Sequence, residues 1–138
     1  GESAGGTGKA RRRSRSPRAA AAPVVPSPPP PPPPVANLFA ALPPARDGEA
    51  FEALLERPGV RIERIVSHGQ ATPADAPMVQ AQDEWVVLLA GAAGLRIEGM
   101  AAVTLRPGDH LFIPRGQKHW VTWTASDRPS VWLAVHLE

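Results

Sequence analysis

Residues 108–119 read Gly-Asp-His-Leu-Phe-Ile-Pro-Arg-Gly-Gln-Lys-His, and this stretch decides the fold of the 138-residue chain. Pro107 and Gly108 predict a turn, which a short apolar strand follows at residues 111–113. Pro114 and Gly116 predict a second tight turn, so that His119 begins the next strand. The stretch therefore holds a histidine beside a rigid turn at the mouth of a β-structure, which suits a ligand or an acid–base group.

The sequence on both sides of this stretch is rich in short strands. Turn residues separate expected strands at about 60–67, 84–90, 94–98, 101–105, 110–113, 119–124 and 131–137. Short strands at this spacing predict an all-β sandwich or barrel. One helix is expected before them, over 47–56, because Asp47 can cap it and Phe51, Leu54 and Leu55 form one apolar stripe. Pro58-Gly59 would end that helix.

The spacing of the opening stretch is Gly-x5-Pro-x-Gly-x2-His, and it resembles the second signature motif of the cupin superfamily. The asparagine that ends this motif is replaced here by Trp123. This resemblance implies a cupin-type jelly-roll β-barrel over residues 37–138. It implies no particular activity, because one fold hosts many functions.

The first cupin motif, Gly-x5-His-x-His-x3,4-Glu-x6-Gly, is only half present. Glu84 and Gly91 match its second half. With a three-residue gap before Glu84, the two histidine positions fall on Met78 and Gln80; with a four-residue gap they fall on residues 77 and 79. The chain thus resembles a small single-domain cupin that keeps the glutamate and the last histidine but lacks the His-x-His pair.

Strand alternation gives a map of the expected site. Glu84 shares a face with Val86, and His119 shares a face with Val121 and Trp123. If both faces point inward, a carboxyl group and an imidazole meet in an apolar cavity. A buried glutamate without a partner is costly, so we expect a metal ion, a Glu–His hydrogen bond, or both.

In metal-bearing cupins, the glutamate and histidine at these positions are ligands. The expected metal ligands are therefore Glu84 and His119, with Gln80 and His68 as auxiliary donors. Such a set suits Fe, Mn, Ni or Zn. The expected pocket walls are Met78, Val86, Val121 and Trp123. His136, in the last strand, is interpreted as a packing or interface histidine.

Three interpretations of this locus stay open. The first is a small-molecule site that a divalent metal assists, with Glu84 and His119 as ligands. The second is a metal-free, non-catalytic barrel that binds or senses a ligand. The third is a buried Glu84–His119 pair that only stabilises the barrel. The sequence does not decide between an enzyme and a binding protein.

The N-terminal region has a different composition. Residues 1–36 hold six Lys and Arg against one acidic residue, a net charge of +5, whereas residues 37–138 hold nine against twelve, a net charge of −3. We expect a disordered tail over 1–36, with a polyproline II rod at Pro28–Pro34. The acidic balance of the domain argues against nucleic acid as a partner.

Composition also constrains the location and the assembly of the protein. The chain has no cysteine and no apolar run of the roughly 20 residues that span a bilayer, so neither disulfides nor membrane insertion is expected. We expect a cytoplasmic homodimer that binds a small molecule, with tryptophan at the interface. Organellar targeting by the Arg- and Ser-rich tail is the alternative location.

Overall fold

The structure, a computed structural model, describes residues 22–138. The chain divides into two units, Gly1–Pro34 and Val35–Glu138. Residues 22–34 of the first unit are exposed and contain neither helix nor strand. The six Lys and Arg residues of the predicted tail lie within residues 9–18, outside the described residues. The expected disorder of the tail therefore stays a prediction.

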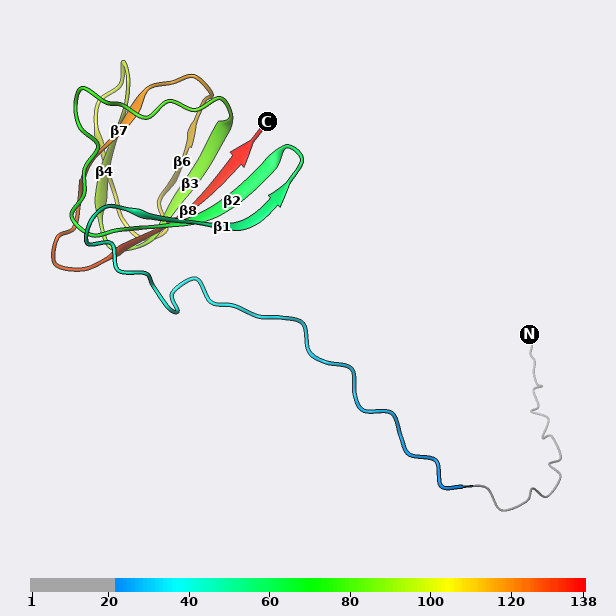
Figure 1. Ribbon diagram of the computed structural model, residues 1–138. Helices are drawn as coiled ribbons and strands as arrows, with labels where there is room; N and C mark the ends of the chain where they lie inside the picture. Colours follow the sequence, from blue (N-terminus) through cyan, green and yellow to red (C-terminus); the bar gives the residue numbers. More distant parts are fainter. Residues whose placement is uncertain (1–21) are drawn as a thin grey trace, which may run out of the picture. The chain divides into compact units, whose positions relative to one another are not determined.

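The second unit is built from β-strands alone, which confirms the all-β jelly-roll prediction. A five-stranded sheet has the order β1-β2-β8-β3-β6, and a three-stranded sheet has the order β5-β4-β7. The two sheets face each other across the barrel (Figure 1). The strands are β1 (Ala50–Arg57), β2 (Val60–Ser67), β3 (Asp83–Ala90), β4 (Ala93–Ile97), β5 (Val103–Leu105), β6 (His110–Ile113), β7 (His119–Thr124) and β8 (Ser130–Leu137).

The expected helix over 47–56 is wrong, because this segment forms strand β1. Arg57 pairs with Val60, so Pro58-Gly59 is the turn of a β-hairpin and not the end of a helix. Gly59 has a φ of 80°, which suits the second central residue of such a turn. The helix-like apolar spacing is overridden by backbone pairing with residues 60–66 of β2.

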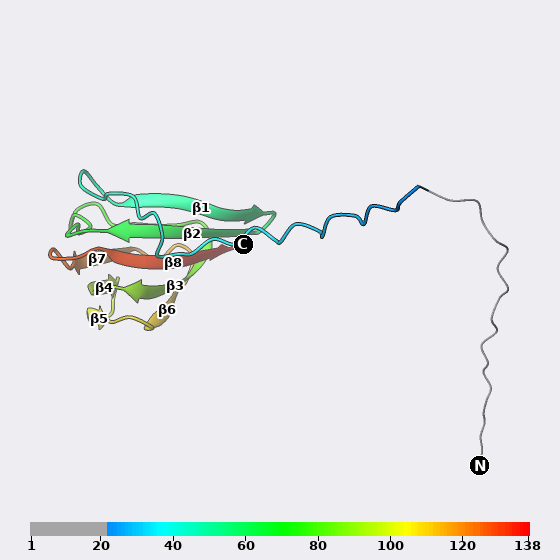
Figure 2. The same ribbon diagram turned by 90° about the horizontal axis from the view of Figure 1, so that it is seen from below.

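The core lies between the sheets and uses the inward faces of β3 to β8. Figure 2 shows the barrel from below, with β1 and β2 along one side and β5 and β6 along the other. Leu88, on β3, has no solvent exposure. The core cluster consists of Val86, Leu88, Ala93, Leu95, Ile97, Leu105, Ile113, Val121, Trp132 and Ala134. Both sheets contribute, as inside–outside alternation predicts.

The turn before β7 is fastened to the loop before β3. Gly116 donates its N–H to the carbonyl of Gln80 at 2.8 Å, and the N–H of Arg115 donates to Asp83 Oδ1 at 2.9 Å. His119 and Met78 exchange two backbone hydrogen bonds of 2.9 Å. Two segments far apart in the sequence are thereby held in one register, with Gln80 and His119 close together.

A short N-terminal segment is fixed to the outer face of the five-stranded sheet by Arg64 of β2. The Arg64 guanidinium donates to the carbonyls of Leu38 and Ala40 at 3.0 and 2.9 Å, and it pairs with Glu52 of β1. Arg64 is buried despite its charge. Because a buried charge needs partners, these carbonyls belong to the stable fold.

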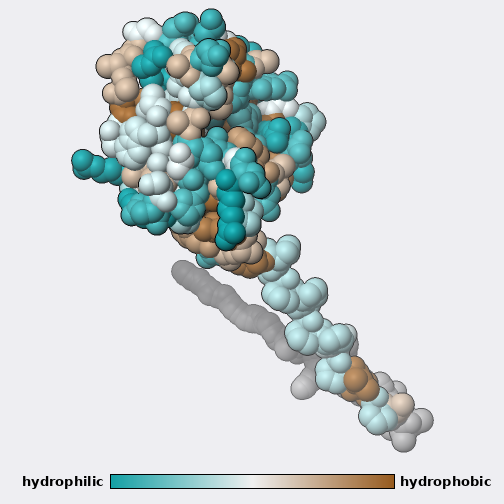
Figure 3. Space-filling view, turned by 60° about the vertical axis from the view of Figure 1, so that its left-hand side comes forward, coloured by the Kyte–Doolittle hydropathy of each residue, from teal (hydrophilic) through white to brown (hydrophobic). Residues whose placement is uncertain are grey.

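The exterior of the barrel unit is mixed in polarity. The face in Figure 3 is mainly hydrophilic, with smaller apolar areas between the polar ones. Within residues 22–138, no helix is long and apolar enough to cross a membrane.

Candidate functional site

Glu84 and His119 converge inside the barrel. Glu84 is the second residue of β3 and His119 is the first of β7, and their exposed fractions are only 6% and 1%. Glu84 Oε1 lies 3.8 Å from His119 Nε2. This distance is too long for a hydrogen bond, but one atom placed between the two groups can contact both. Gln80 completes the group by donating from Nε2 to Glu84 Oε1 at 2.7 Å.

A small cavity of about 50 Å³, here called the lumen cavity, lies at these side chains. Six residues expected at the site line it: Met78, Gln80, Glu84, Val86, His119 and Val121. The remaining lining residues are Glu49, Phe51, Glu63, Ile65, Ile113 and Trp132. The cavity therefore has apolar walls and a small group of polar side chains, as ligand sites commonly do.

Burial raises the pKa of Glu84 above its ordinary value. Positive charge on His136 or His119 and the hydrogen bond from Gln80 oppose this rise, whereas the carboxylate of Glu63 adds to it. The protonated form of Glu84 is therefore favoured more than in water. In that form the carboxyl group can donate a hydrogen bond.

The ring of His119 is oriented by its own turn. Its Nδ1 lies 3.2 Å from the carbonyl oxygen of Gln117. Because a carbonyl only accepts, Nδ1 must carry the hydrogen of this bond. In the neutral ring, Nε2 then has a free lone pair on the side of Glu84. His119 thus offers an acceptor to the lumen cavity.

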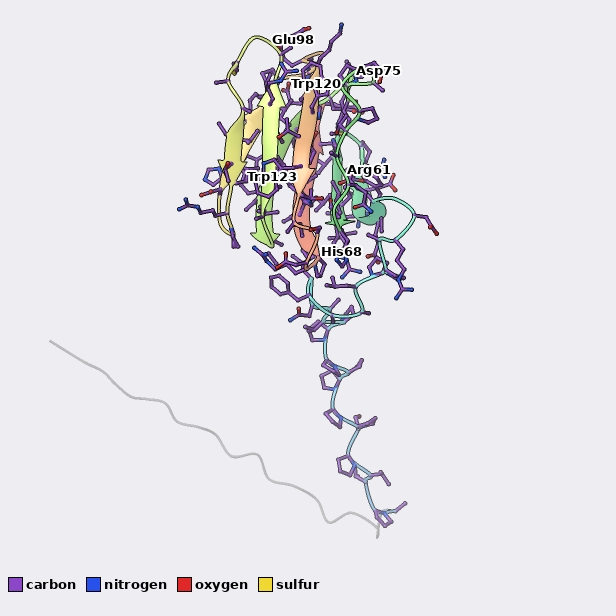
Figure 4. The ribbon with its side chains drawn as sticks, turned by 90° about the vertical axis from the view of Figure 1, so that its left-hand side faces the viewer. Arg61, His68, Asp75, Glu98, Trp120 and Trp123 are labelled. Carbon is purple, nitrogen blue, oxygen red and sulfur yellow. The ribbon has the colours of Figure 1, made fainter. Side chains whose placement is uncertain are left out.

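His68, expected as an auxiliary donor, lies apart from this group. Glu63 and Ile65 line the lumen cavity, so the odd-numbered residues of β2 face inward and the expectation of an inward His68 has the wrong parity. Strand β2 also ends at Ser67, and Gly69 turns the chain with a φ of 88°. The exposed His68 ring instead bonds through Nε2 to the carbonyl of Ser126 at 3.0 Å. Figure 4 shows His68 near the lower end of the barrel in that view.

Trp123, expected as a pocket wall, does not line the lumen cavity and is exposed. Gly94 of β4 pairs with Trp123, whereas the next residue, Leu95, pairs with Val121. Thr122 is therefore an extra residue on β7, a β-bulge that reverses the alternation beyond it. His119 and Val121 face inward, but Trp123 does not.

The sequence did not identify a second buried ionisable pair, Glu63 and His136. Their exposed fractions are 6% and 8%, and His136 Nε2 lies 2.9 Å from Glu63 Oε1. His136 pairs in register with Glu84 on the neighbouring strand. The available signal was alternation: His136 shares a face with the core residues Trp132 and Ala134, as Glu84 does with Val86.

The donor set does not by itself form a complete metal site. Within the described part of the chain, no group of three or more His, Cys, Asp or Glu side chains is arranged to hold a metal ion. Glu84 and His119 supply two donors, and Gln80 turns its amide nitrogen toward Glu84. A carboxyl group and one imidazole are fewer ligands than protein sites for transition metals usually use.

Comparison with known proteins identifies the family. The family model described as "Cupin domain" matches residues 62–136, which is more than half of the chain. The chain belongs to the cupin family. None of the curated proteins matches this cupin.

Solved structures agree with this assignment. A protein from Ralstonia eutropha, described as a "putative mannose-6-phosphate isomerase", is 47% identical; the match covers 77% of this cupin and 99% of that chain, with a TM-score of 0.74. A Thermus thermophilus protein is 21% identical over 75% of this chain and 95% of its own, with a TM-score of 0.63. A cupin superfamily protein from Desulfitobacterium hafniense is 20% identical, covering 73% and 88%, with a TM-score of 0.59. The last two show the fold alone.

Proposed function

We propose that this cupin binds a small hydroxylated molecule, with one hydroxyl group of the ligand in the lumen cavity between Glu84 and His119. The observation that carries the proposal is the 3.8 Å separation of two buried, convergent polar atoms. One oxygen atom can lie about 2.8 Å from both, which is the length of a good hydrogen bond.

The two groups are also chemically complementary. The raised pKa of Glu84 favours its protonated form, which is a donor, and His119 Nε2 is an acceptor. A hydroxyl group accepts one hydrogen bond and donates another, so it satisfies both partners at once. A carboxylate ligand would satisfy only Glu84, and an ammonium ligand only His119.

The small lumen volume of about 50 Å³ restricts what can enter. It suits one small group, so the rest of a ligand must extend beyond it. The name of the Ralstonia eutropha protein makes mannose 6-phosphate a natural probe, because that protein is 47% identical to this one. Mannose and ethylene glycol complete the series, and ethylene glycol is small enough to report on the lumen cavity alone.

Binding can be followed by NMR of the histidine rings and backbone amides. We expect ethylene glycol to shift the His119 signals at millimolar concentration. We expect Glu84→Ala and His119→Ala, which remove the hydrogen-bonding groups, to weaken this response. Glu98→Ala, at an exposed turn, is the matched control and should respond like the parent. If the His119 signals respond to none of the three compounds, or if Glu84→Ala leaves the response unchanged, the proposal is wrong.

Divalent metal binding at Glu84 and His119 is the second candidate, as the resemblance to metal-bearing cupins suggests. The orientation of His119 favours it, because a backbone carbonyl holding Nδ1–H is a common arrangement behind a histidine ligand. Gln80, whose side chain would have to turn its amide oxygen inward, is the nearest third donor. A bound metal would supply a Lewis acid beside the ligand.

Elemental analysis separates the two candidates. Protein expressed in media with added Mn, Fe, Ni or Zn should carry stoichiometric metal if this second candidate is right, and Glu84→Gln and His119→Ala should lose it. A ligand response that survives chelator treatment would instead support the metal-free candidate.

A further inference from the structure

A second cavity of about 510 Å³ adjoins the lumen cavity, and we call it the mouth cavity. Phe51, Glu63 and Gln80 line both cavities, so the two are neighbours that meet at these side chains. The mouth cavity is about ten times larger and lies where the rest of a ligand held at Glu84 would extend. Gln80 is the one fixed position of the cupin motifs that lines it.

The polar side of the mouth cavity is an ordered network of side chains. Glu63 uses both carboxylate oxygens: Oε1 bonds to His136 Nε2 at 2.9 Å, and Oε2 pairs with Arg61 Nη2 at 3.1 Å. His136 Nδ1 makes no hydrogen bond with the described residues. Glu63 therefore orients an imidazole and a half-exposed guanidinium that both have donor or acceptor capacity left for a ligand.

The apolar side of the mouth cavity includes an aromatic ring. Phe51 on β1 lines the cavity and is 56% exposed. An exposed ring at the rim of a polar cavity offers a flat apolar surface next to hydrogen-bonding groups. A sugar ring has the matching arrangement, because its face carries C–H groups and its edge carries hydroxyl groups.

The charge of the mouth cavity argues against an anionic ligand. Its lining holds two arginines, Arg57 and Arg61, against three glutamates, Glu56, Glu63 and Glu138. Arg61 is already paired with Glu63. Sites for phosphate normally concentrate positive charge, and this one does not.

We propose that the mouth cavity is a subsite for a neutral saccharide or polyol, which lies against Phe51 and bonds through its hydroxyl groups to Arg61 and His136. This inference rests on the proposed function, because a further hydroxyl of the same molecule would reach Glu84 in the lumen cavity. It names the ligand class as uncharged and polyhydroxylated. A sugar phosphate is the excluded alternative.

The test compares mannose with mannose 6-phosphate by NMR titration of the full chain. Mannose should bind at least as tightly as mannose 6-phosphate, since the phosphate would approach three carboxylates. Phe51→Ala should weaken mannose binding by about tenfold, the usual scale for loss of an aromatic contact. Phe51→Tyr should restore it, because the ring is kept.

Phe112→Ala is the matched control, because Phe112 is 51% exposed but lies on β6, away from the mouth cavity. It should change mannose binding less than about twofold. Equal effects of Phe51→Ala and Phe112→Ala, tighter binding of mannose 6-phosphate than of mannose, or no mannose binding at all would each overturn the inference.

Different results contradict the subsite and the proposed function, so each can be tested independently of the other. Loss of mannose binding in Phe51→Ala with no loss in Glu84→Ala supports the subsite and contradicts the proposed function. A response to ethylene glycol that depends on Glu84, together with no effect of Phe51→Ala on mannose, supports the proposed function and contradicts the subsite.

Discussion

At the scale of single residues, Glu84 is the group whose surroundings change its chemistry most clearly. Burial raises its pKa, and only partial compensation comes from two imidazoles and the Gln80 amide. The folded chain therefore keeps a proton on Glu84 at pH values where the unfolded chain has lost it. Such a group reduces stability once it must ionise inside the protein.

This shift predicts how stability depends on pH. Since the folded state binds the extra proton, the contribution of Glu84 to the free energy of unfolding should fall as pH rises from the ordinary value of 4.5 to the raised pKa, and stay constant above it. Glu84→Gln cannot ionise and should lack this fall. Urea unfolding at a series of pH values measures the difference from the parent.

Glu98→Gln is the matched control here and should follow the parent curve, because Glu98 is exposed. A difference between parent and Glu84→Gln that does not vary with pH would contradict the assignment.

A motif spacing was enough to predict that Glu84 and His119 converge, whereas their role as ligands stays a prediction. Glu84 and His119 occupy motif positions, and the structure brings them together in the lumen cavity. Glu63 and His136 have no motif spacing, and their pairing depends on the register of β2 and β8, which local sequence does not reveal. Trp123 was expected on the inward face of β7, but the extra residue Thr122 turns it outward. The sequence pattern of apolar residues does not reveal such a bulge.

At the scale of elements, turns determine the strand ends, and glycine determines several turns. Gly91, between β3 and β4, has a φ of 87° and lies against Ser130, whose Cα would be 2.6 Å from an added Cβ atom. Gly99, between β4 and β5, has nearly the same φ, 85°, but has open space around it. A comparison of Gly91 with Gly99 therefore distinguishes the cost of backbone strain from the cost of steric overlap.

Alanine at each glycine should therefore have different effects. Gly99→Ala should cost about 1 kcal/mol of unfolding free energy, the usual cost of a left-handed conformation. Gly91→Ala should cost about 2 kcal/mol more, because the backbone of Ser130 must move. Urea unfolding of both variants measures this, and equal losses would show that β8 can shift freely beside Gly91.

Element prediction from sequence succeeded where turn residues bounded the strands and failed at β1. The seven expected strands agree with β2–β8 within two residues at each end. Residues 50–57 contain good helix formers, and their apolar spacing fits a helix as well as an edge strand. Backbone pairing with β2 makes this segment a strand, and local helix propensity does not predict that pairing.

At the scale of the whole molecule, the chain consists of a barrel unit and a preceding unit of different composition. Every contact of the candidate site belongs to the barrel unit. We expect a chain that begins at Val35 to keep the melting temperature of the full chain within about 2 °C, since loss of about 1 kcal/mol would shift it by about 4 °C or more. Thermal unfolding followed by circular dichroism measures this, and a larger drop would show that residues 1–34 stabilise the barrel.

Self-association is the second whole-molecule prediction. Strand β1 is an edge of the five-stranded sheet and exposes Phe51, Leu54 and Leu55, while Trp123 is exposed on β7. Such edges and exposed aromatic rings are usual at interfaces, so we expect a homodimer with Trp123 buried in it. Sedimentation velocity at several concentrations should give the dimer mass, and Trp123→Ala should shift the equilibrium toward monomer. A monomer mass throughout would contradict the prediction.

Arg64 limits how far the chain can be shortened from its N-terminal side before the barrel is destabilised. Its guanidinium is enclosed by the carbonyls of Leu38 and Ala40, so proteolysis just after Ala41 would strip a desolvated cation of most of its acceptors. The family model matches only from residue 62, which makes the preceding segment look dispensable. The buried charge of Arg64 instead places the beginning of the barrel upstream of Leu38, ahead of the segment that the family model matches.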